Sequence, residues 1–359
     1  MKKYIFLLSI VVIFTMFVLP ASAEDRVDGY LSEFESILPE NMSGITEDSG
    51  IIIEKFSLKG LLSEIFASIS GEGGGVLAFF LVLIGSLALT ALASNCHEDF
   101  AKQTQAAVGV ILSLAIFPYV SSALSSVAHS LSELSAFFTA LTPITVGMTA
   151  LGGGVTTAGV QAGGMFTALT VIGGVGSRLF LSISSFGLAI AMLSALGNSS
   201  AASVGRGIKG LFTWAVGIFT TLITAVFSLQ TLVASAADSA AMRTARYMAS
   251  GLIPVVGSTV SGALATLASG LSYAKSIVGG GSIAVILSLV ISPLVMLLLY
   301  RLALTLAIIA AGLVGAQGPS DIFTAYRFAL DMTVAVYVLS VIVYLFQLIL
   351  FLRIGVALL

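Results

Sequence analysis

The stretch Thr333–Leu352 reads TVAVYVLSVIVYLFQLILFL, and it decides the fold class of the chain. It contains fourteen Val, Leu, Ile and Phe residues against one glutamine, Gln347. A helix needs about 20 apolar residues to cross a bilayer, and each of these residue types favours insertion by about 0.3 to 0.6 kcal/mol. The stretch therefore predicts a membrane-spanning helix near the C-terminus.

A second apolar block, Ser282–Ala316, precedes this span and completes a region of C-terminal membrane spans at residues 282–359. As one helix the block is about 52 Å long at 1.5 Å per residue, which exceeds a hydrocarbon core of about 30 Å. Two arrangements stay open. Either the helix kinks at Pro293 and tilts, or the block is a hairpin that turns near Arg301.

Further spans are expected in a glycine-rich multispan membrane region at residues 75–229. Four of its segments are long and apolar enough to cross a bilayer: Gly75–Ser94, Ala106–Ala128, Leu179–Leu196 and Gly210–Leu229. Between them, Phe137–Gly176 is apolar but is broken by Pro143 and by glycine clusters. It fits two glycine-rich spans or one re-entrant element. The mature chain is expected to cross the membrane six to eight times.

Charged residues between the apolar segments predict loops and turns. Arg206 and Lys209 indicate a cytoplasmic loop, because basic residues favour that side, and the loop His129–Glu133 is expected on the other side. Arg178 and Arg301 lie at seams between apolar blocks. We expect each at an interfacial turn with its side chain reaching water, the alternative being a functional charge within the membrane.

The composition indicates the same class. The chain is 58% apolar and 9% charged, whereas soluble proteins are about 25% charged. The sequence therefore predicts an all-α fold, a polytopic helical integral membrane protein surrounded by lipid. Its 37 glycines fit dense packing within the chain, self-association into a homo-oligomer, or a re-entrant loop lining a pore.

Several functional classes are disfavoured. The sequence has no basic tract, which argues against nucleic acid as a partner. The GxxxxGK[ST], GxSxG and HExxH motifs are absent from it, so neither an enzyme nor a cofactor is expected. The run Asn95–Asp99 lacks the spaced ligand pairs of zinc sites and predicts a simple loop, with no metal.

The N-terminus has the pattern of an export signal. Lys2 and Lys3 precede the apolar run Tyr4–Leu19, and small residues follow at Ala21–Ala23. This predicts a signal peptide at residues 1–23, the alternative being an uncleaved first membrane helix. In either case the segment from Glu24 onward lies on the extracytoplasmic side.

The segment at residues 24–74 is acidic. It holds eleven of the seventeen acidic residues and three basic ones, a net charge of 3 − 11 = −8. Apolar residues at helical spacing predict two short amphipathic helices in it. About fifty residues bury little core alone, so we expect this extracytoplasmic segment to dock on a partner, on the membrane surface, or helix on helix.

Residues 230–281 form a less apolar helical segment with a stripe of polar side chains. Arg243 and Arg246 share one helix face, and Asp238 points elsewhere. The stripe fits a solvated helix at the membrane surface, a docking face or a polar pore lining. Pro254 and Gly257 end this pattern.

The run from Leu229 to Gly257 contains QT-x-x-A-S-x-A-D-S, then R-T-A, then P-V-V-G. It resembles the stage III sporulation protein AE family, as does the layout of signal, acidic segment and multispan body. The candidate docking or motif residues are Gln230, Thr231, Ser235, Asp238, Ser239, Arg243, Thr244, Arg246, Pro254 and Gly257.

The resemblance implies a multi-pass protein of the mother-cell membrane around the forespore in endospore-forming bacteria. It implies a subunit of the secretion-like channel complex that joins mother cell and forespore and supports late forespore development. The implied partners are the other stage III sporulation A-series proteins, including an ATPase, and stage II sporulation protein Q. No catalytic role attaches to the motif residues.

The alternative function is a stand-alone secondary transporter or permease. Such proteins bind their substrate at helices broken within the membrane, and Phe137–Gly176 and Gly251–Gly281 are interrupted by glycines. The absence of a clear internal repeat in the sequence argues against this class.

Overall fold

The computed structural model describes residues 26–39, 42, 58–93, 98–195, 200–252 and 257–353. In these ranges the long elements are all helices: α3 Leu58–Ala93, α4 Glu98–Leu151, α5 Val155–Ala195, α6 Ser200–Leu252, α7 Gly257–Val314 and α8 Gln317–Arg353. A shorter N-terminal helix covers residues 26–36. The expected all-α fold is confirmed.

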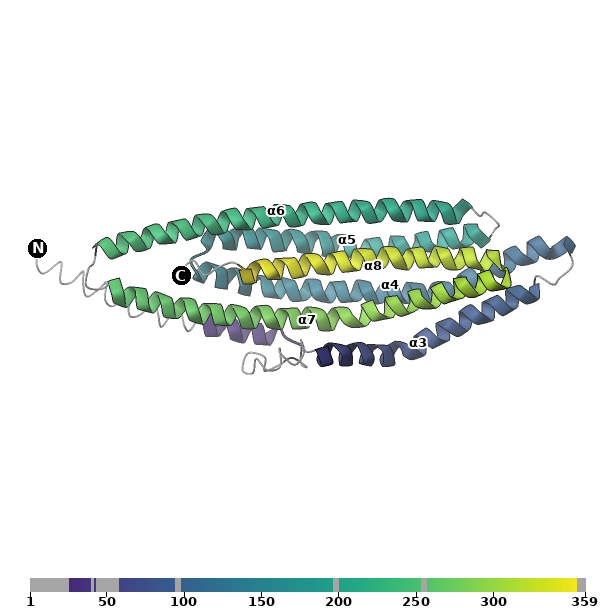
Figure 1. Cartoon of the computed structure of the whole chain (residues 1–359), viewed down its shortest axis with the longest axis horizontal. Coiled ribbons are helices and arrows are strands. Elements are labelled where there is room, and N and C mark those ends of the chain that lie inside the picture. Colours follow the sequence, from purple (N-terminus) through teal and green to yellow (C-terminus); the bar gives the residue numbers. More distant parts are fainter. Residues whose placement is uncertain are drawn as a thin grey trace, which may run out of the picture.

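The six long helices lie along one axis, and successive helices run in opposite directions (Figure 1). Helix α8 contacts α4, α5, α6 and α7 and forms the centre of the bundle. Its position explains why Gln317–Arg353 has the largest buried share of the four most apolar stretches. Helix α3 covers one side of the bundle and packs mainly on α7.

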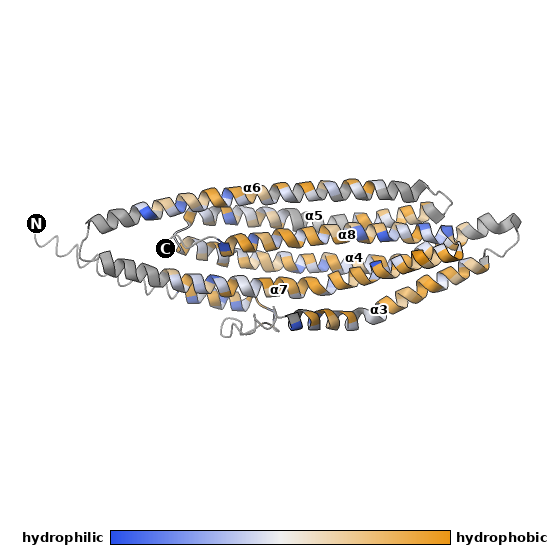
Figure 2. Cartoon of the chain, viewed as in Figure 1, coloured by the Kyte–Doolittle hydropathy of each residue, from blue (hydrophilic) through white to orange (hydrophobic). Residues whose placement is uncertain are grey.

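Four stretches of these helices are long and apolar enough to cross a membrane: Gly73–Leu92, Ala106–Leu151, Ala268–Val314 and Gln317–Arg353. Apolar residues cover much of these helices (Figure 2). The 54 residues of α4 and the 58 of α7 correspond to about 81 and 87 Å at 1.5 Å per residue, far more than a hydrocarbon core of about 30 Å. The bundle therefore combines features of a multi-pass membrane protein with helices that extend past one bilayer.

The predictions of a loop at His129–Glu133 and of interfacial turns at Arg178 and Arg301 are wrong. The segment His129–Glu133 lies inside α4, and Arg178 and Arg301 lie inside α5 and α7. Helix α7 continues through Pro293, so the block Ser282–Ala316 is part of one helix and not a hairpin. A proline removes one backbone hydrogen bond, but packing against neighbouring helices holds the helix together on either side of it.

The glycine-rich segment between residues 137 and 176 consists of two helical pieces. It comprises the end of α4 and the first half of α5, which meet at a turn over residues 152–154. The expected boundaries after residues 74, 229 and 281 fall inside α3, α6 and α7.

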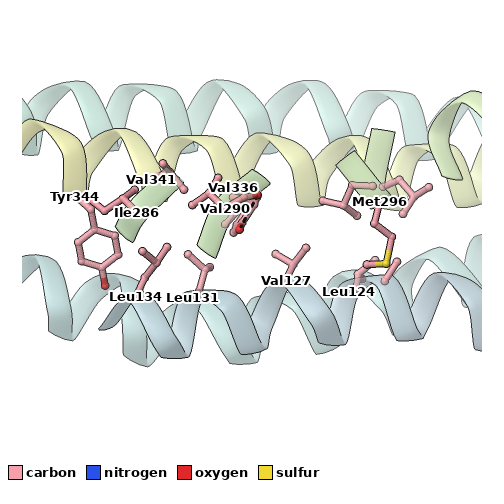
Figure 3. Packing of buried hydrophobic residues seen from close by; sticks show 14 of the residues in the cluster. Leu124, Val127, Leu131, Leu134, Ile286, Val290, Met296, Val336, Val341 and Tyr344 are labelled. Carbon is pink, nitrogen blue, oxygen red and sulfur yellow. Dashed lines mark hydrogen bonds between the residues drawn. The ribbon is translucent and has the colours of Figure 1, made fainter. Parts of the chain in front are cut away.

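Apolar side chains of α4, α7 and α8 interdigitate along the middle of the bundle (Figure 3). Leu131 of α4, Ile286 of α7 and Val341 of α8 belong to this layer. Three tyrosines of α8 cross it toward α4. The hydroxyl groups of Tyr337 and Tyr344 share hydrogen bonds of 2.7 Å with Ser130 and Ser135, and Tyr326 donates to the carbonyl of Ser113 at 2.6 Å.

The N-terminal helix packs on the body of the bundle. Phe34 is fully buried in the main core, with Tyr30 and Leu31 packed against it. Gly147 of α4 leaves the room that the Tyr30 ring occupies, because a Cβ at this position would overlap the ring. Asp28 and Glu33 face outward. The expected signal peptide lies outside the described residues.

Candidate functional site

The side chain of Asp238 joins two helices that are distant in sequence. Its carboxylate oxygens accept the backbone N–H groups of Thr156 at 3.1 Å and Thr157 at 2.7 Å. These amides belong to the first turn of α5, where no carbonyl of the same helix can accept them. A carboxylate supplied by α6 therefore caps α5 and also interacts favourably with the positive end of its dipole.

The turn that brings α5 to this position depends on glycine. Gly153 has a φ of 82°, a left-handed conformation that other residues rarely adopt. Its N–H donates to the carbonyl of Ala150 at 3.0 Å, and that of Gly154 donates to Thr149 at 3.1 Å. A Cβ on Gly154 would come within 3.1 Å of the Thr149 carbonyl oxygen and 3.3 Å of Thr149 Cγ2, so a glycine lets the turn pack closely against the end of α4.

Buried polar side chains continue from the capped end into the bundle. The hydroxyl of Thr149 on α4 donates to Gln161 Oε1 on α5 at 2.8 Å. Four buried side-chain atoms of the described residues have no hydrogen-bond partner, and three of them belong to this region: Thr157 Oγ1, Gln161 Nε2 and Gln347 Nε2. Gln347 of α8 lies beside Gly164 of α5. These groups form a buried polar cluster between α4, α5, α6 and α8. Its unpaired atoms can hydrogen-bond ordered water.

The motif in α6 splits into an inner and an outer face. Phe227, Thr231, Ala234 and Asp238 are buried and follow one another at steps of four, three and four residues. This spacing places them on one side of the helix. Thr231 and Asp238 are therefore held inside the chain, where they support packing between helices.

The outer face of α6 carries other motif residues. Gln230, Arg243 and Thr244 are exposed, and the Thr244 hydroxyl donates back to the Ala240 carbonyl at 2.9 Å. Ser235 and Ser239 are half-buried at the edges between the two faces. A row of exposed apolar side chains lies on the same helix: Leu211, Trp214, Ile218, Leu222, Val226, Leu229, Leu232 and Val233.

For three of the sequence-predicted residues, the structure gives only the position in the chain or does not describe the residue. Arg246 lies in α6, but its side chain is not among those described. Gly257 is the first residue of α7, and Pro254 lies outside the described residues. The segment Asn95–Cys96–His97 also lies outside them.

Sequence reasoning missed the partners of Asp238. It identified the glycine cluster at residues 152–154 as a break in an apolar segment. It did not identify the cluster as the turn before the capped N-terminus of α5. Gln161 was not identified, and Gln347 was noted only as the one polar residue of the last span, although a single amide inside an apolar run is a useful signal, since a buried amide needs partners. The pairing of α5 with α6 has no local signature.

These features define a polytopic α-helical membrane protein whose inner polar groups join helices to one another. The sequence profile of the stage III sporulation protein AE family matches residues 38–357, and the chain belongs to that family. A curated relative, stage III sporulation protein AE of Bacillus subtilis (strain 168), is 20% identical over 284 residues, which are 76% of this chain and 71% of the relative. No solved structure matches the chain significantly. Membership implies a role in sporulation.

Proposed function

We propose that this protein is a membrane subunit of the secretion-like channel complex that links mother cell and forespore and that late forespore development requires. The observation that carries the proposal is the family match across residues 38–357, which includes all of the long helices up to Arg353. The polar groups described above serve helix packing, which suits a structural subunit without a catalytic role.

The position of the N-terminal helix supports a membrane topology. This helix follows the expected export signal, so it belongs to the extracytoplasmic side, and it packs on α4 near Gly147. The α4–α5 turn lies six residues further on and belongs to the same side. Because successive helices alternate in direction, the end of the bundle that holds the start of α6 is then cytoplasmic. Arg206 and Lys209 lie at this end, in agreement with the preference of basic residues.

The proposed partners are the other stage III sporulation A-series proteins, including the ATPase, and stage II sporulation protein Q. In the proposed topology the ATPase meets the cytoplasmic ends of the helices. Stage II sporulation protein Q approaches from the forespore, toward the end where the N-terminal helix docks. The exposed face of α6, with Gln230 and Arg243, supports the docking role proposed for the motif.

The structure gives less support to a stand-alone transporter. Helix α7 runs through Gly279–Gly281 without interruption, and α5 runs through Gly163 and Gly164. Within residues 155–195 and 257–314 there is thus no broken helix of the kind that binds transported solutes.

The test is deletion and complementation in a spore-forming host that carries this chain. Deletion is expected to reduce heat-resistant spores strongly, and the tagged full-length chain, purified from sporulating membranes, is expected to retain A-series proteins. Normal sporulation of the deletion strain contradicts the proposal. Solute flux through liposomes that contain this chain alone favours the transporter instead.

A further inference from the structure

The outer side of α6 is exposed in the second half of the helix. Helix α6 packs mainly on α5 and α8, through a buried stripe that includes Asp238. The residues on its other sides are exposed, and most of them are small: Ala236, Ala237, Ala240, Ala241, Arg243 and Thr244. We call these six residues the alanine face. Small side chains allow a second helix to approach closely.

This part of α6 is positively charged on its outside. Asp238 points inward, and its carboxylate accepts two backbone N–H groups of α5. Arg243 is exposed, and Arg246 follows it by about one helical turn. Among the described side chains, no carboxylate pairs with Arg243. The alanine face therefore presents a positive charge to whatever packs against it.

The N-terminal helix carries the opposite charge on its exposed side. The outward residues are small or acidic: Asp28, Gly29, Ser32, Glu33 and Ser36. We call these five residues the acidic face. The hydroxyl groups of Ser32 and Ser36 donate to carbonyls of their own helix at 2.9 and 2.7 Å, so the serines act as small residues. Residues 26–36 contain one basic and three acidic residues, a net charge of 1 − 3 = −2. The two faces are thus complementary in charge, and both are small enough for close packing.

The two faces lie at the same height along the bundle but on opposite sides of it. Tyr30 packs where Gly147 of α4 leaves room, two residues or about 3 Å before Thr149. The Thr149 carbonyl accepts the N–H of Gly154 at 3.1 Å, and a Cβ on Gly154 would lie 3.6 Å from an Asp238 carboxylate oxygen. The alanine face surrounds and follows Asp238 on α6. In Figure 1, α6 lies along one long side of the bundle and the N-terminal helix lies on the other.

Copies of the chain that insert in one orientation keep these heights. When two copies lie side by side, the alanine face of one is therefore level with the acidic face of the next. Pairing of α6 with α6 about a two-fold axis would instead place Arg243 beside the Arg243 of the other copy, and like charges oppose that arrangement. The charges thus favour a contact between two different surfaces.

We propose that the alanine face of α6 binds the acidic face of the N-terminal helix of a second copy of this chain. Small side chains set the close approach, and the opposite charges select the partner surface and its register. A contact between two different surfaces leaves one of each kind exposed at the ends of the pair, so further copies add until a ring closes. The inference goes beyond the proposed function, which concerns contacts with other proteins.

The test is disulfide cross-linking of full-length chains in membranes of a host without other sporulation proteins. Cys96, the only cysteine of the sequence, is first replaced by serine. One tagged chain carries Ser32→Cys and a second, differently tagged chain carries Ala240→Cys, both at exposed positions. Produced together and oxidised, they are expected to form a mixed dimer, whereas neither is expected to cross-link when produced alone. A chain with both substitutions is expected to give a ladder of dimers, trimers and larger products.

Charge reversal tests the complementarity of the two faces. In the chain that carries both cysteines, Arg243→Glu is expected to lower the cross-linked fraction about tenfold, because it places like charges opposite each other. Glu33→Arg is expected to have the same effect for the same reason. Combining the two reversals restores opposite charges at every contact and is expected to restore the ladder. Arg353→Glu reverses an exposed charge at the end of α8, outside both faces, and is the control that leaves the ladder unchanged.

Three results overturn the inference. They are the lack of a mixed dimer, cross-linking of the Ala240→Cys chain with itself, and a ladder that does not respond to Arg243→Glu. Membrane fractionation of each variant confirms insertion, so a ladder lost from an inserted variant is assigned to the contact between copies. The experiment involves no other sporulation protein and no spore count, so its failure leaves the proposed sporulation role untouched.

Discussion

Asp238 accepts the backbone N–H of Thr157 at 2.7 Å although 81 residues of sequence separate them. The carboxylate belongs to α6 and the amide to the first turn of α5, so one side chain fixes the start of one helix against the flank of another. One residue of the α6 motif, Asp238, is therefore buried and caps the N-terminus of α5.

Replacing Asp238 by alanine is expected to destabilise the protein. It leaves two N–H groups of α5 without acceptors, at a cost of about 1–3 kcal/mol for each buried group. Thermal unfolding of the purified protein in detergent measures the effect, with Gln230→Ala on the exposed side of α6 as the control. Equal unfolding midpoints for the two variants contradict the capping role.

Gly153→Ala is expected to weaken the turn between α4 and α5. A left-handed conformation costs a residue with a Cβ about 1–2 kcal/mol. Gly159→Ala is the matched control, since Gly159 lies within α5 and a Cβ there meets no atom within 4 Å. Denaturant unfolding is expected to show a loss for the first variant and none for the second. A stable Gly153→Ala protein contradicts the conformation described here.

Gly147→Ala is expected to release the N-terminal helix. The new methyl group overlaps the ring of Tyr30 and forces it to move, while Gly270→Ala, which has open space around it, leaves the helix docked. Limited proteolysis of the detergent-solubilised protein measures docking as the rate of cleavage within residues 26–39. Unchanged cleavage in Gly147→Ala argues against the contact.

Tyr326→Phe is expected to cost about 1 kcal/mol, because the Ser113 carbonyl loses its side-chain donor inside the bundle. Tyr273→Phe is the control, because Tyr273 is mostly exposed on α7. The free energies of unfolding of the two variants, measured in the same detergent, are expected to differ by that amount. A neutral Tyr326→Phe indicates that the hydroxyl does not help to join α8 to α4.

The double variant Arg243→Ala and Arg246→Ala tests the docking role of the motif. Arg243 is exposed on α6, so we expect the variant to insert normally but to assemble poorly with its partners. Membrane fractionation measures insertion and co-purification measures assembly, with Arg353→Ala at the end of α8 as the control. A double variant that assembles and sporulates like the parent refutes the docking role.

The sequence was sufficient to predict the helical fold and the apolar character of each long segment. It was insufficient for the boundaries. A proline often ends a helix. Here packing against neighbouring helices allows α4 to continue through Pro118 and Pro143 and α7 to continue through Pro293. Charged residues such as Arg301 were expected at turns because a lone charge is costly in lipid, whereas the structure pairs this one with Asp331 of another helix.

The candidate site was predictable only in part. Periodicity identified the polar positions of α6, and it correctly separated Asp238 from the face of Arg243. It could not show that the amides of Thr156 and Thr157 receive the carboxylate, because backbone donors leave no mark in a sequence. The same limit applies to Gln161 and Gln347, whose neighbours are set by how α4, α5 and α8 assemble.

The cap on α5 also has a consequence for biogenesis. A ribosome making about 5–20 residues per second adds Asp238 roughly 4–16 s after Thr157. During that interval the nascent α5 has exposed amides at its leading end and needs water, lipid headgroups or an insertion factor to solvate them. The α4–α5 hairpin thus enters the translocation machinery before the residue that completes it has been synthesised.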